Sequence, residues 1–150
     1  MTRRILVPLD GSVDSESVLG IAQSVARSWG PATLRLLHVA PFTQAVVADG
    51  RVVSYADQET DRARTRTLAY LHAVAAHLDG VEAECVVRFG EPVEAILEEA
   101  RASGADCVAM ATGVTTARSV LNLSVAERVL RAGDLPVLLV HKDAWQAVAG

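Results

Sequence analysis

The chain has 150 residues, 51% of them hydrophobic, and its 14 basic and 18 acidic residues give a formal net charge of −4. This length suits a single domain, residues 1–150, with a core of its own. The acidic balance argues against nucleic acid or an anionic membrane as a partner. No apolar run approaches the roughly 18 residues that a membrane helix needs, and no secretory signal is recognisable, so we expect a cytoplasmic protein.

Strand-like and helix-like patterns alternate along the chain. Short apolar runs bounded by turn residues predict strands. The predicted strands are residues 5–9, 34–39, 81–89, 106–111 and 136–140. Apolar stripes with a period of 3.6 residues predict helices between them. The predicted helices are residues 13–29, 57–78, 92–103 and 124–132. Residues 41–55 show no clear period and are predicted to form a long loop, whereas residues 114–122 are ambiguous.

The order of these elements predicts the fold. Strands that alternate with helices form parallel sheets joined by right-handed crossovers. Residues 81–89 alternate strictly between apolar and charged side chains, so one face of this strand meets water and the strand is expected at or near a sheet edge. The predicted fold class is α/β, a single-domain open parallel five-stranded sheet with helices on both faces, of the Rossmann-like type.

Several reactive side chains are assigned structural roles. Cys85 and Cys107 each lie within an apolar strand pattern, so both are predicted to be buried, reduced and unlinked. The four histidines have no spacing that suits a metal, and two strand cysteines do not complete a zinc set. Glu98 and Glu99 are predicted to lie on a solvated face of the third helix.

A ligand site is expected at the carboxyl ends of the strands, where open α/β sheets bind ligands. Asp10, Val39 and Gly113 follow three of these strands. Asp10 is either a turn or helix-capping carboxylate or an acceptor for a ligand's hydrogen bonds. Ser124 forms a capping box with Glu127, Ser-x-x-Glu, either alone or shared with a phosphate contact at the helix start. Further hydroxyls that are either solvated or phosphate ligands precede it, at Thr115, Thr116 and Ser119.

Several catalytic motifs do not occur in the sequence. It contains no Gly-x-x-x-x-Gly-Lys-Ser/Thr phosphate loop, no Gly-x-Gly-x-x-Gly after the first strand and no Gly-x-Ser-x-Gly elbow. Residues 10–15 faintly resemble the Ser-Gly-Gly-x-Asp-Ser loop of ATP pyrophosphatases, but Asp10 replaces the first Ser and Ser12 the second Gly. Enzymatic turnover is therefore not expected.

Three separated segments resemble the universal stress protein family. Ile-Leu-Val-Pro-Leu-Asp-Gly-Ser at residues 5–12 is similar to the start of these proteins, and Leu-Leu-His-Val at residues 36–39 to their second strand. Residues 124–131, followed by residues 136–140, resemble their ending. The order and spacing agree across the whole chain. The resemblance implies the adenine nucleotide alpha hydrolase-like form of the Rossmann-like fold and a role in the stress response.

One branch of this family binds ATP through the pattern Gly-x2-Gly-x9-Gly-Ser/Thr. When the final Ser/Thr of this pattern is aligned with Ser124, its three glycines fall at Met110, Gly113 and Leu123. Only Gly113 and Ser124 therefore match the pattern. Glycine permits positive φ and a close approach of backbone to phosphate. The bulky side chains of Met110 and Leu123 crowd that approach, so the chain is more similar to the branch that does not bind ATP.

The adenosine end of the family's site is retained, because Asp10 and Val39 are both present. The candidate site for ATP or another adenine nucleotide comprises Asp10, Val39, Gly113, Ser124 and Val125. The leading hypothesis is a regulatory or protective protein without turnover and with weak or no ATP binding. The alternative is an adenine-nucleotide-binding protein with an atypical phosphate loop.

The last predicted strand also bears on assembly. Residues Val137 to Val140 form an apolar strand that is expected at one margin of the sheet, and a bare apolar edge invites pairing. The family resemblance implies that two such strands meet across a two-fold axis, the commonest closed assembly. We therefore expect a homodimer.

Overall fold

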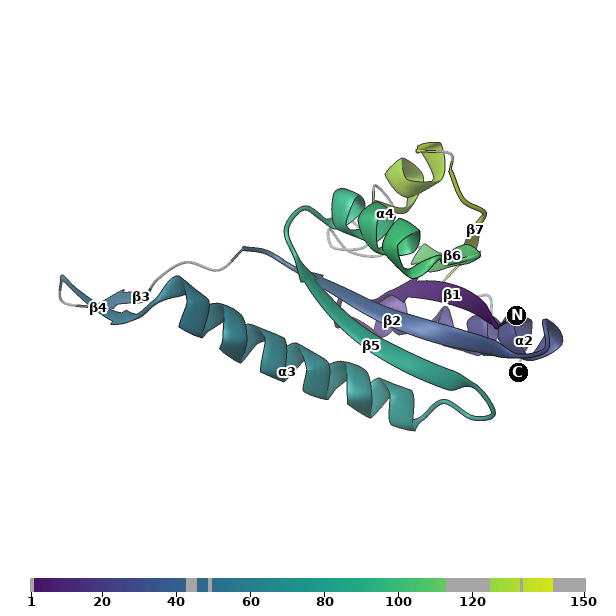
Figure 1. The fold of residues 1–150 in the computed structure, drawn as a ribbon, viewed down its shortest axis with the longest axis horizontal. Helices are drawn as coiled ribbons and strands as arrows, with labels where there is room; N and C mark the ends of the chain where they lie inside the picture. The colour runs from purple at the N-terminus through teal and green to yellow at the C-terminus, as the bar shows by residue number, and fades with distance from the viewer. Residues whose placement is uncertain (1, 43–45, 49, 113–124, 133, 142–150) are drawn as a thin grey trace.

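The computed structural model describes residues 2–42, 46–48, 50–112, 125–132 and 134–141. Its main sheet has five parallel strands in the order β5-β2-β1-β6-β7 (Figure 1). Their bounds are β1 Arg3–Pro8, β2 Ala32–Ala40, β5 Glu82–Phe89, β6 Cys107–Thr112 and β7 Val137–His141. The predicted fold class is confirmed, and β5 and β7 lie at the two edges as expected. No helix within the described ranges is long and apolar enough to cross a membrane.

Helices cover both faces of this sheet (Figure 1). Their bounds are α1 Val13–Glu16, α2 Leu19–Ser28, α3 Ala56–Ala76 and α4 Pro92–Ser103, and residues 125–131 are also helical. α2 and α3 share one core with residues such as Leu71, whereas α4 and residues 125–131 share another with residues such as Ile96. Ile5 and Leu6 of β1 are fully buried in these two different cores, because successive side chains of a strand face opposite sides.

The helix predicted over residues 13–29 is interrupted, so that prediction was wrong. α1 ends at Glu16 and α2 begins at Leu19. Between them, the Ser17 hydroxyl donates to the Asp14 carbonyl oxygen at 2.7 Å, and the Ser17 backbone N–H donates to the same oxygen at 3.3 Å. Serine side chains compete with the helical hydrogen-bond ladder in this way. The turn that results precedes Val18, which is fully buried.

The loop predicted over residues 41–55 contains a hairpin, which corrects the sequence interpretation. β3, Val46–Ala48, pairs antiparallel with β4, Arg51–Ser54, and Gly50 between them has a φ of 73°. Asp-Gly between two valine-rich runs is a strong hairpin signal, because the turn needs positive φ. Figure 1 shows this hairpin at the outer end of α3, away from the main sheet.

α4 begins and ends where the sequence predicted. Its first residue is Pro92, whose missing N–H costs nothing at a helix start. The Glu91 carboxylate caps this end by accepting a hydrogen bond from the Glu94 backbone N–H at 2.8 Å. Gly104 follows the last residue in the left-handed conformation, with a φ of 67°, which glycine adopts without steric cost.

Glu99 does not lie on a solvated face, and that prediction was wrong. Only 3% of this residue is exposed. Its carboxylate accepts hydrogen bonds from Arg35 Nε at 2.7 Å and from Arg88 Nε at 2.5 Å, which join α4 to β2 and β5. Burial alone would raise the pKa of Glu99, but the hydrogen bonds and charges of the two arginines outweigh it and hold the pKa below its usual range. Glu98 remains exposed and pairs with Arg88 at 3.3 Å.

The ion pairs continue across the sheet. Glu84 of β5 accepts hydrogen bonds from Arg35 at 2.5 Å and from Arg4 of β1 at 3.1 Å. Arg4 also donates to the Ser103 carbonyl oxygen at the end of α4. We call the six charged side chains the ionic network: Arg4, Arg35, Glu84, Arg88, Glu98 and Glu99. It ties β1, β2 and β5 to α4 through charges, in addition to the apolar packing between α4 and the sheet.

The two cysteines lie on strands that are separated by two others. Cys85 belongs to β5 and Cys107 to β6, and both are free thiols. Neighbouring strands lie about 4.8 Å apart, so three spacings put about 14 Å between the two residues, well beyond the reach of a disulfide. Burial also raises the pKa of both thiols, which disfavours the reactive thiolate. An intramolecular disulfide is therefore excluded by the sheet order.

Candidate functional site

A cavity of about 120 Å³ lies at the carboxyl ends of β1, β2 and β6. The chain runs from β1 to one side of the sheet first and to the other side afterwards, so the strand order reverses between β1 and β6. Ligands of open α/β sheets bind at such a point. Four of the residues singled out from the sequence line the cavity: Asp10, Val39, Met110 and Val125. The other predicted residues fall outside the described ranges: Gly113, Thr115, Thr116, Ser119, Leu123 and Ser124.

The cavity wall is mainly apolar. Leu37 of β2 and Ile96 of α4 line it together with Met110 of β6, and Pro92 contributes from the first turn of α4. Met110 is only 7% exposed, so most of its side chain packs between the strands and α4. The sequence analysis predicted this helix but missed its contribution to the site. The sequence could have indicated it, because a helix that follows a parallel strand begins at the carboxyl edge of the sheet, where the ligand site is expected.

Asp10 is held in place by hydrogen bonds within the turn that follows β1. Its Oδ1 accepts from the Ser12 backbone N–H at 2.8 Å and from the Ser12 hydroxyl at 2.5 Å. Ser12 caps α1 by accepting from the Ser15 backbone N–H at 3.1 Å. The Ser15 hydroxyl donates to the Ser12 carbonyl oxygen at 2.9 Å and accepts from the Asp10 N–H at 3.2 Å. Of the two roles considered for Asp10, the turn carboxylate is therefore confirmed, and the residue also lines the cavity.

The neighbouring backbone is fixed by His38. Its Nδ1 lies 2.9 Å from the Leu9 carbonyl oxygen. A carbonyl oxygen only accepts hydrogen bonds, so Nδ1 carries the proton and donates. The Leu9 N–H in turn donates to the Leu37 carbonyl oxygen at 2.8 Å. These bonds join the ends of β1 and β2 immediately beside the cavity.

Tyr70 of α3 reports the electrostatic potential near the Asp10 turn. Burial raises the pKa of Tyr70 to about 12, and the negative charges of Glu16 and Asp10 contribute to the increase. Both charges disfavour a second anion. Of these three residues only Asp10 lines the cavity, and its carboxylate suits the hydroxyl or amino donors of a ligand better than its phosphates.

The start of α4 is already occupied by a carboxylate. The hydrogen bond from the Glu94 backbone N–H holds the pKa of Glu91 below its usual range, and Arg128 adds to this effect. Arg128 pairs with Glu91 at 3.3 Å and so links residues 125–131 to α4. The positive end of the α4 dipole is thus neutralised within the chain, and this helix offers no open anion site. Among the described residues, no cluster of three His, Cys, Asp or Glu side chains could hold a metal ion.

Comparison with known proteins identifies the family. Residues 1–141 match the Universal stress protein family. Universal stress protein YxiE of Bacillus subtilis (strain 168) is 27% identical over 150 residues, which cover 94% of this chain and all of the relative. A crystal structure of a universal stress protein family member from Burkholderia pseudomallei is 26% identical, with a TM-score of 0.67, and the match covers 91% of this chain and 94% of that one.

A further solved structure, of a universal stress protein in complex with cAMP, supports the fold. It is 22% identical with a TM-score of 0.66, and the match covers 93% of this chain and 97% of that one. The family match spans nearly the whole sequence and agrees with the sheet order and the position of the cavity. The chain therefore belongs to the universal stress protein family.

Proposed function

We propose that this protein is a regulatory or protective member of its family that works as a homodimer, without turnover, and binds ATP weakly or not at all. The observation that carries this proposal is the position of Met110. Its side chain lines the cavity where the ATP-binding pattern has its first glycine. A buried thioether chain at that place takes up space that glycine leaves to the ligand and its phosphates.

The dimensions and charge of the cavity support the same conclusion. Sites for small molecules and cofactors have volumes of about 300–1,000 Å³. The cavity of about 120 Å³ is smaller, its wall is mainly apolar, and Asp10 is its charged side chain among the described residues. Such a cavity accommodates a ring with hydrogen-bond donors better than a triphosphate.

A second candidate function is binding of an adenine nucleotide through an atypical phosphate loop. It is favoured by the retention of Asp10 and Val39 at the cavity wall. A structural relative in complex with cAMP shares the fold. In this alternative, Ser124 and the helix start that follows it contact the phosphate.

Calorimetric titration with adenosine and with ATP distinguishes the two functions. If the triphosphate finds no site, ATP is expected to bind no more tightly than adenosine, because only the nucleoside end contributes. Micromolar binding of ATP, at least tenfold tighter than adenosine, would contradict the proposal and favour the alternative. Mass spectrometry of small molecules that remain bound after purification provides an independent check, since a copurifying nucleoside triphosphate would lead to the same conclusion.

The homodimer is proposed to form through β7. This strand pairs with β6 on one side only, and Leu139 in its middle is 36% exposed. Replacing Leu139 by Lys is expected to weaken the dimer at least tenfold, since a lysine on an edge strand opposes pairing with another chain. Leu130→Lys is the matched control, because Leu130 is also exposed, at 47%, but lies outside β7. Analytical ultracentrifugation that finds the same assembly size for Leu139→Lys, Leu130→Lys and the wild type would exclude the β7 interface.

A further inference from the structure

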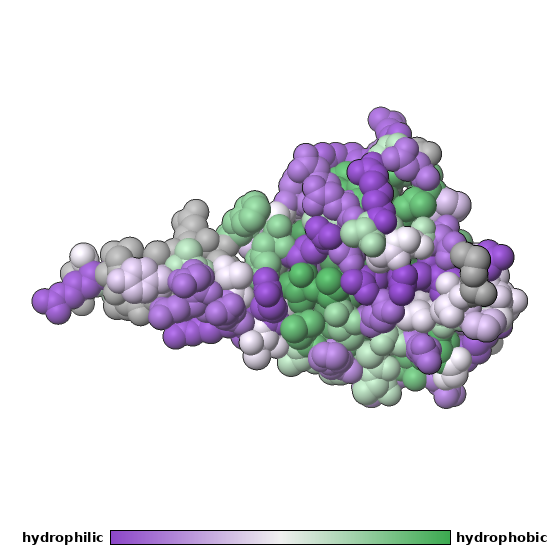
Figure 2. Space-filling model, viewed as in Figure 1, coloured by the Kyte–Doolittle hydropathy of each residue, from purple (hydrophilic) through white to green (hydrophobic). Residues whose placement is uncertain are grey.

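The hairpin and the first half of α3 form an arm that leaves the body of the domain. We define the arm as β3, β4 and residues 56–66. Figure 1 shows the hairpin at its tip, and Figure 2 shows mainly hydrophilic side chains along this half of α3. β3 and β4 make a two-stranded sheet that is separate from the main sheet. Two-stranded hairpins are marginally stable on their own in water, so this one needs a surface to pack against.

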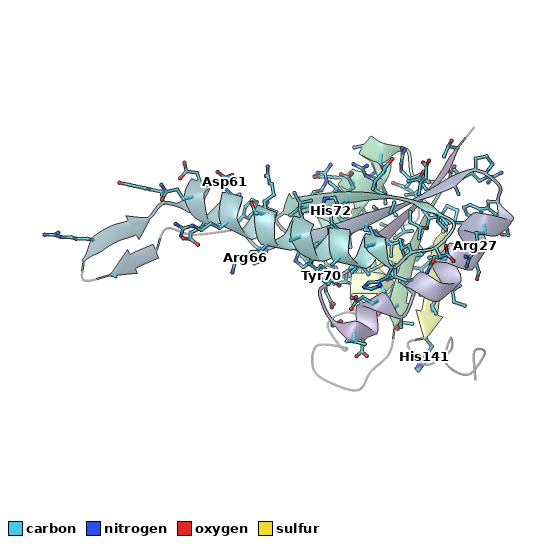
Figure 3. The ribbon with its side chains drawn as sticks, turned by 90° about the horizontal axis from the view of Figure 1, so that it is seen from below. Arg27, Asp61, Arg66, Tyr70, His72 and His141 are labelled. Carbon is cyan, nitrogen blue, oxygen red and sulfur yellow. The ribbon has the colours of Figure 1, made fainter. Side chains whose placement is uncertain are left out.

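One stripe of α3 runs from the arm to the body of the domain. Its residues recur at alternating intervals of four and three, which is the spacing of a helix–helix seam. The stripe, called the α3 seam below, consists of Glu59, Ala63, Arg66, Tyr70, Ala73 and His77. All six residues are partly or fully exposed. Figure 3 shows Arg66 and Tyr70 on the same side of α3, opposite Asp61 and His72.

The seam carries opposite charges seven residues apart. Glu59 and Arg66 lie two helical turns from each other on the same side. Glu59 already pairs with Arg62 of its own helix at 3.0 Å. If two α3 helices pack antiparallel about a two-fold axis, Arg66 of each copy joins this pair of the other, so the contacts are of opposite charge. An interface about a two-fold axis requires such self-complementarity. Ala63 lies between them, and its small side chain permits a close approach of the two helices.

We propose that two copies of this chain associate antiparallel through their α3 seams, with the hairpin of each copy seated in a groove of the other. The groove lies between α2 and α3, has a volume of about 440 Å³, and is lined by Leu19, Val74 and Leu78 as well as by seam residues. Its apolar wall suits the valine-rich hairpin sequence. The occupant is therefore a second copy of the same arm.

The dimensions agree with this arrangement. When Glu59 lies opposite Arg66, residue 55 of one copy lies beside residue 70 of the other. The strands of the hairpin have three and four residues, so they extend about 10 Å beyond residue 55, which equals about seven residues of α3. They therefore reach residues 70–77, which is where α3 lines the groove.

Tyr70 gives an independent indication that the groove is incomplete. Its hydroxyl oxygen is buried and makes no hydrogen bond of good geometry within the described residues, although the Glu16 carboxylate lies near enough to contribute to its raised pKa. Buried polar atoms in native proteins almost always have a partner. The outer strand of a docked hairpin presents unpaired backbone N–H and C=O groups, and either group satisfies a tyrosine hydroxyl.

The test uses charge reversal in the full-length chain that also carries Leu139→Lys, so that association through β7 does not contribute. This background is expected to form a seam dimer. Glu59→Arg places like charges opposite Arg66, and Arg66→Glu places them opposite Glu59, so each is expected to weaken the dimer at least tenfold. Mixing the two variants restores both opposite-charge pairs, because each copy then meets its complement. Sedimentation velocity should show monomers for either variant alone and a heterodimer for the mixture.

Asp61→Arg is the matched control, because Asp61 is exposed on the opposite side of α3 and should leave the dimer unchanged. Recovery in the mixture also separates a loss of the interface from a loss of folding. Three results would each contradict the proposed seam interface. They are a Leu139→Lys background that is monomeric, a dimer that Asp61→Arg weakens as much as the seam variants do, and a mixture that stays monomeric. None of these results bears on the β7 dimer, which is judged by the change from wild type to Leu139→Lys.

Discussion

Replacing both Met110 and Leu123 by glycine is expected to tighten ATP binding at least tenfold relative to the parent protein. Met110 lines the cavity, and the two substitutions complete the pattern Gly-x2-Gly-x9-Gly-Ser. Glycine at these positions permits a close approach of the backbone to phosphate, and the sequence already has Gly113 and Ser124 at the other positions of the pattern. Arg118 lies within the nine-residue spacer and supplies a positive charge. Calorimetric titration of both proteins with ATP measures the change.

The same variant should be less stable. Met110 is 7% exposed, and exchanging a buried Met for a small residue commonly costs about 2–5 kcal/mol. Glycine also increases the freedom of the unfolded chain. Val108→Gly is the matched control, because Val108 is buried in the same strand but does not line the cavity. It should lose stability and gain no ATP binding. A folded double variant that binds ATP no better than the parent would show that these side chains are not the barrier.

Glu99→Gln is expected to lower the free energy of unfolding by about 3 kcal/mol, because it leaves two partly buried arginines without their shared carboxylate. Glu99 is the most deeply buried member of the ionic network and receives hydrogen bonds from both Arg35 and Arg88. Glutamine keeps the shape of the side chain but removes its charge. Urea unfolding followed by circular dichroism measures the change. Glu98→Gln is the control, since Glu98 is exposed and its substitution should cost less than about 0.5 kcal/mol.

The pH dependence of this difference identifies the charge as its cause. The pKa of Glu99 is lowered in the folded protein, so its carboxylate stabilises the fold fully above the unfolded pKa of about 4.3. That contribution is lost as the pH falls through the folded pKa. The stability gap between wild type and Glu99→Gln should therefore be constant near neutral pH and shrink below about pH 4. A gap that stays constant under acid would indicate lost packing instead.

The sequence predicted the elements whose ends are marked by local chemistry. Pro92 and Gly104 bound α4 because one lacks an N–H and the other adopts positive φ, and both effects act within one turn of the helix. The edge position of β5 followed from the alternation of its side chains. The cavity position followed from the strand ends, and Asp10 lines its wall as expected, whereas Met110 was singled out through the family's ATP-binding pattern.

The incorrect predictions concern residues whose partners are distant in the chain or whose turn signal was overlooked. Glu99 looked solvated because its partners, Arg35 and Arg88, come from two strands that a helical pattern does not include. Its spacing of three residues from the buried Ile96 was the available hint. The break at Ser17 coincides with hydrogen bonds from its hydroxyl and its backbone N–H to Asp14, which an apolar periodicity does not reveal. The hairpin was missed although Asp-Gly stood between two valine-rich runs.

The two edges of the main sheet differ in how readily they can pair with a strand of another copy. A sheet with two open edges can in principle add copies head to tail without end, with β7 of one molecule against β5 of the next. The β5 edge carries Glu84 and Arg88, which form ion pairs within the ionic network. Glu82, the first residue of β5, is exposed. A strand docked there would have to desolvate these groups, whereas β7 has an apolar sequence. Pairing between sheet edges would therefore favour β7 against β7, an arrangement that closes after two molecules and does not extend the sheet further.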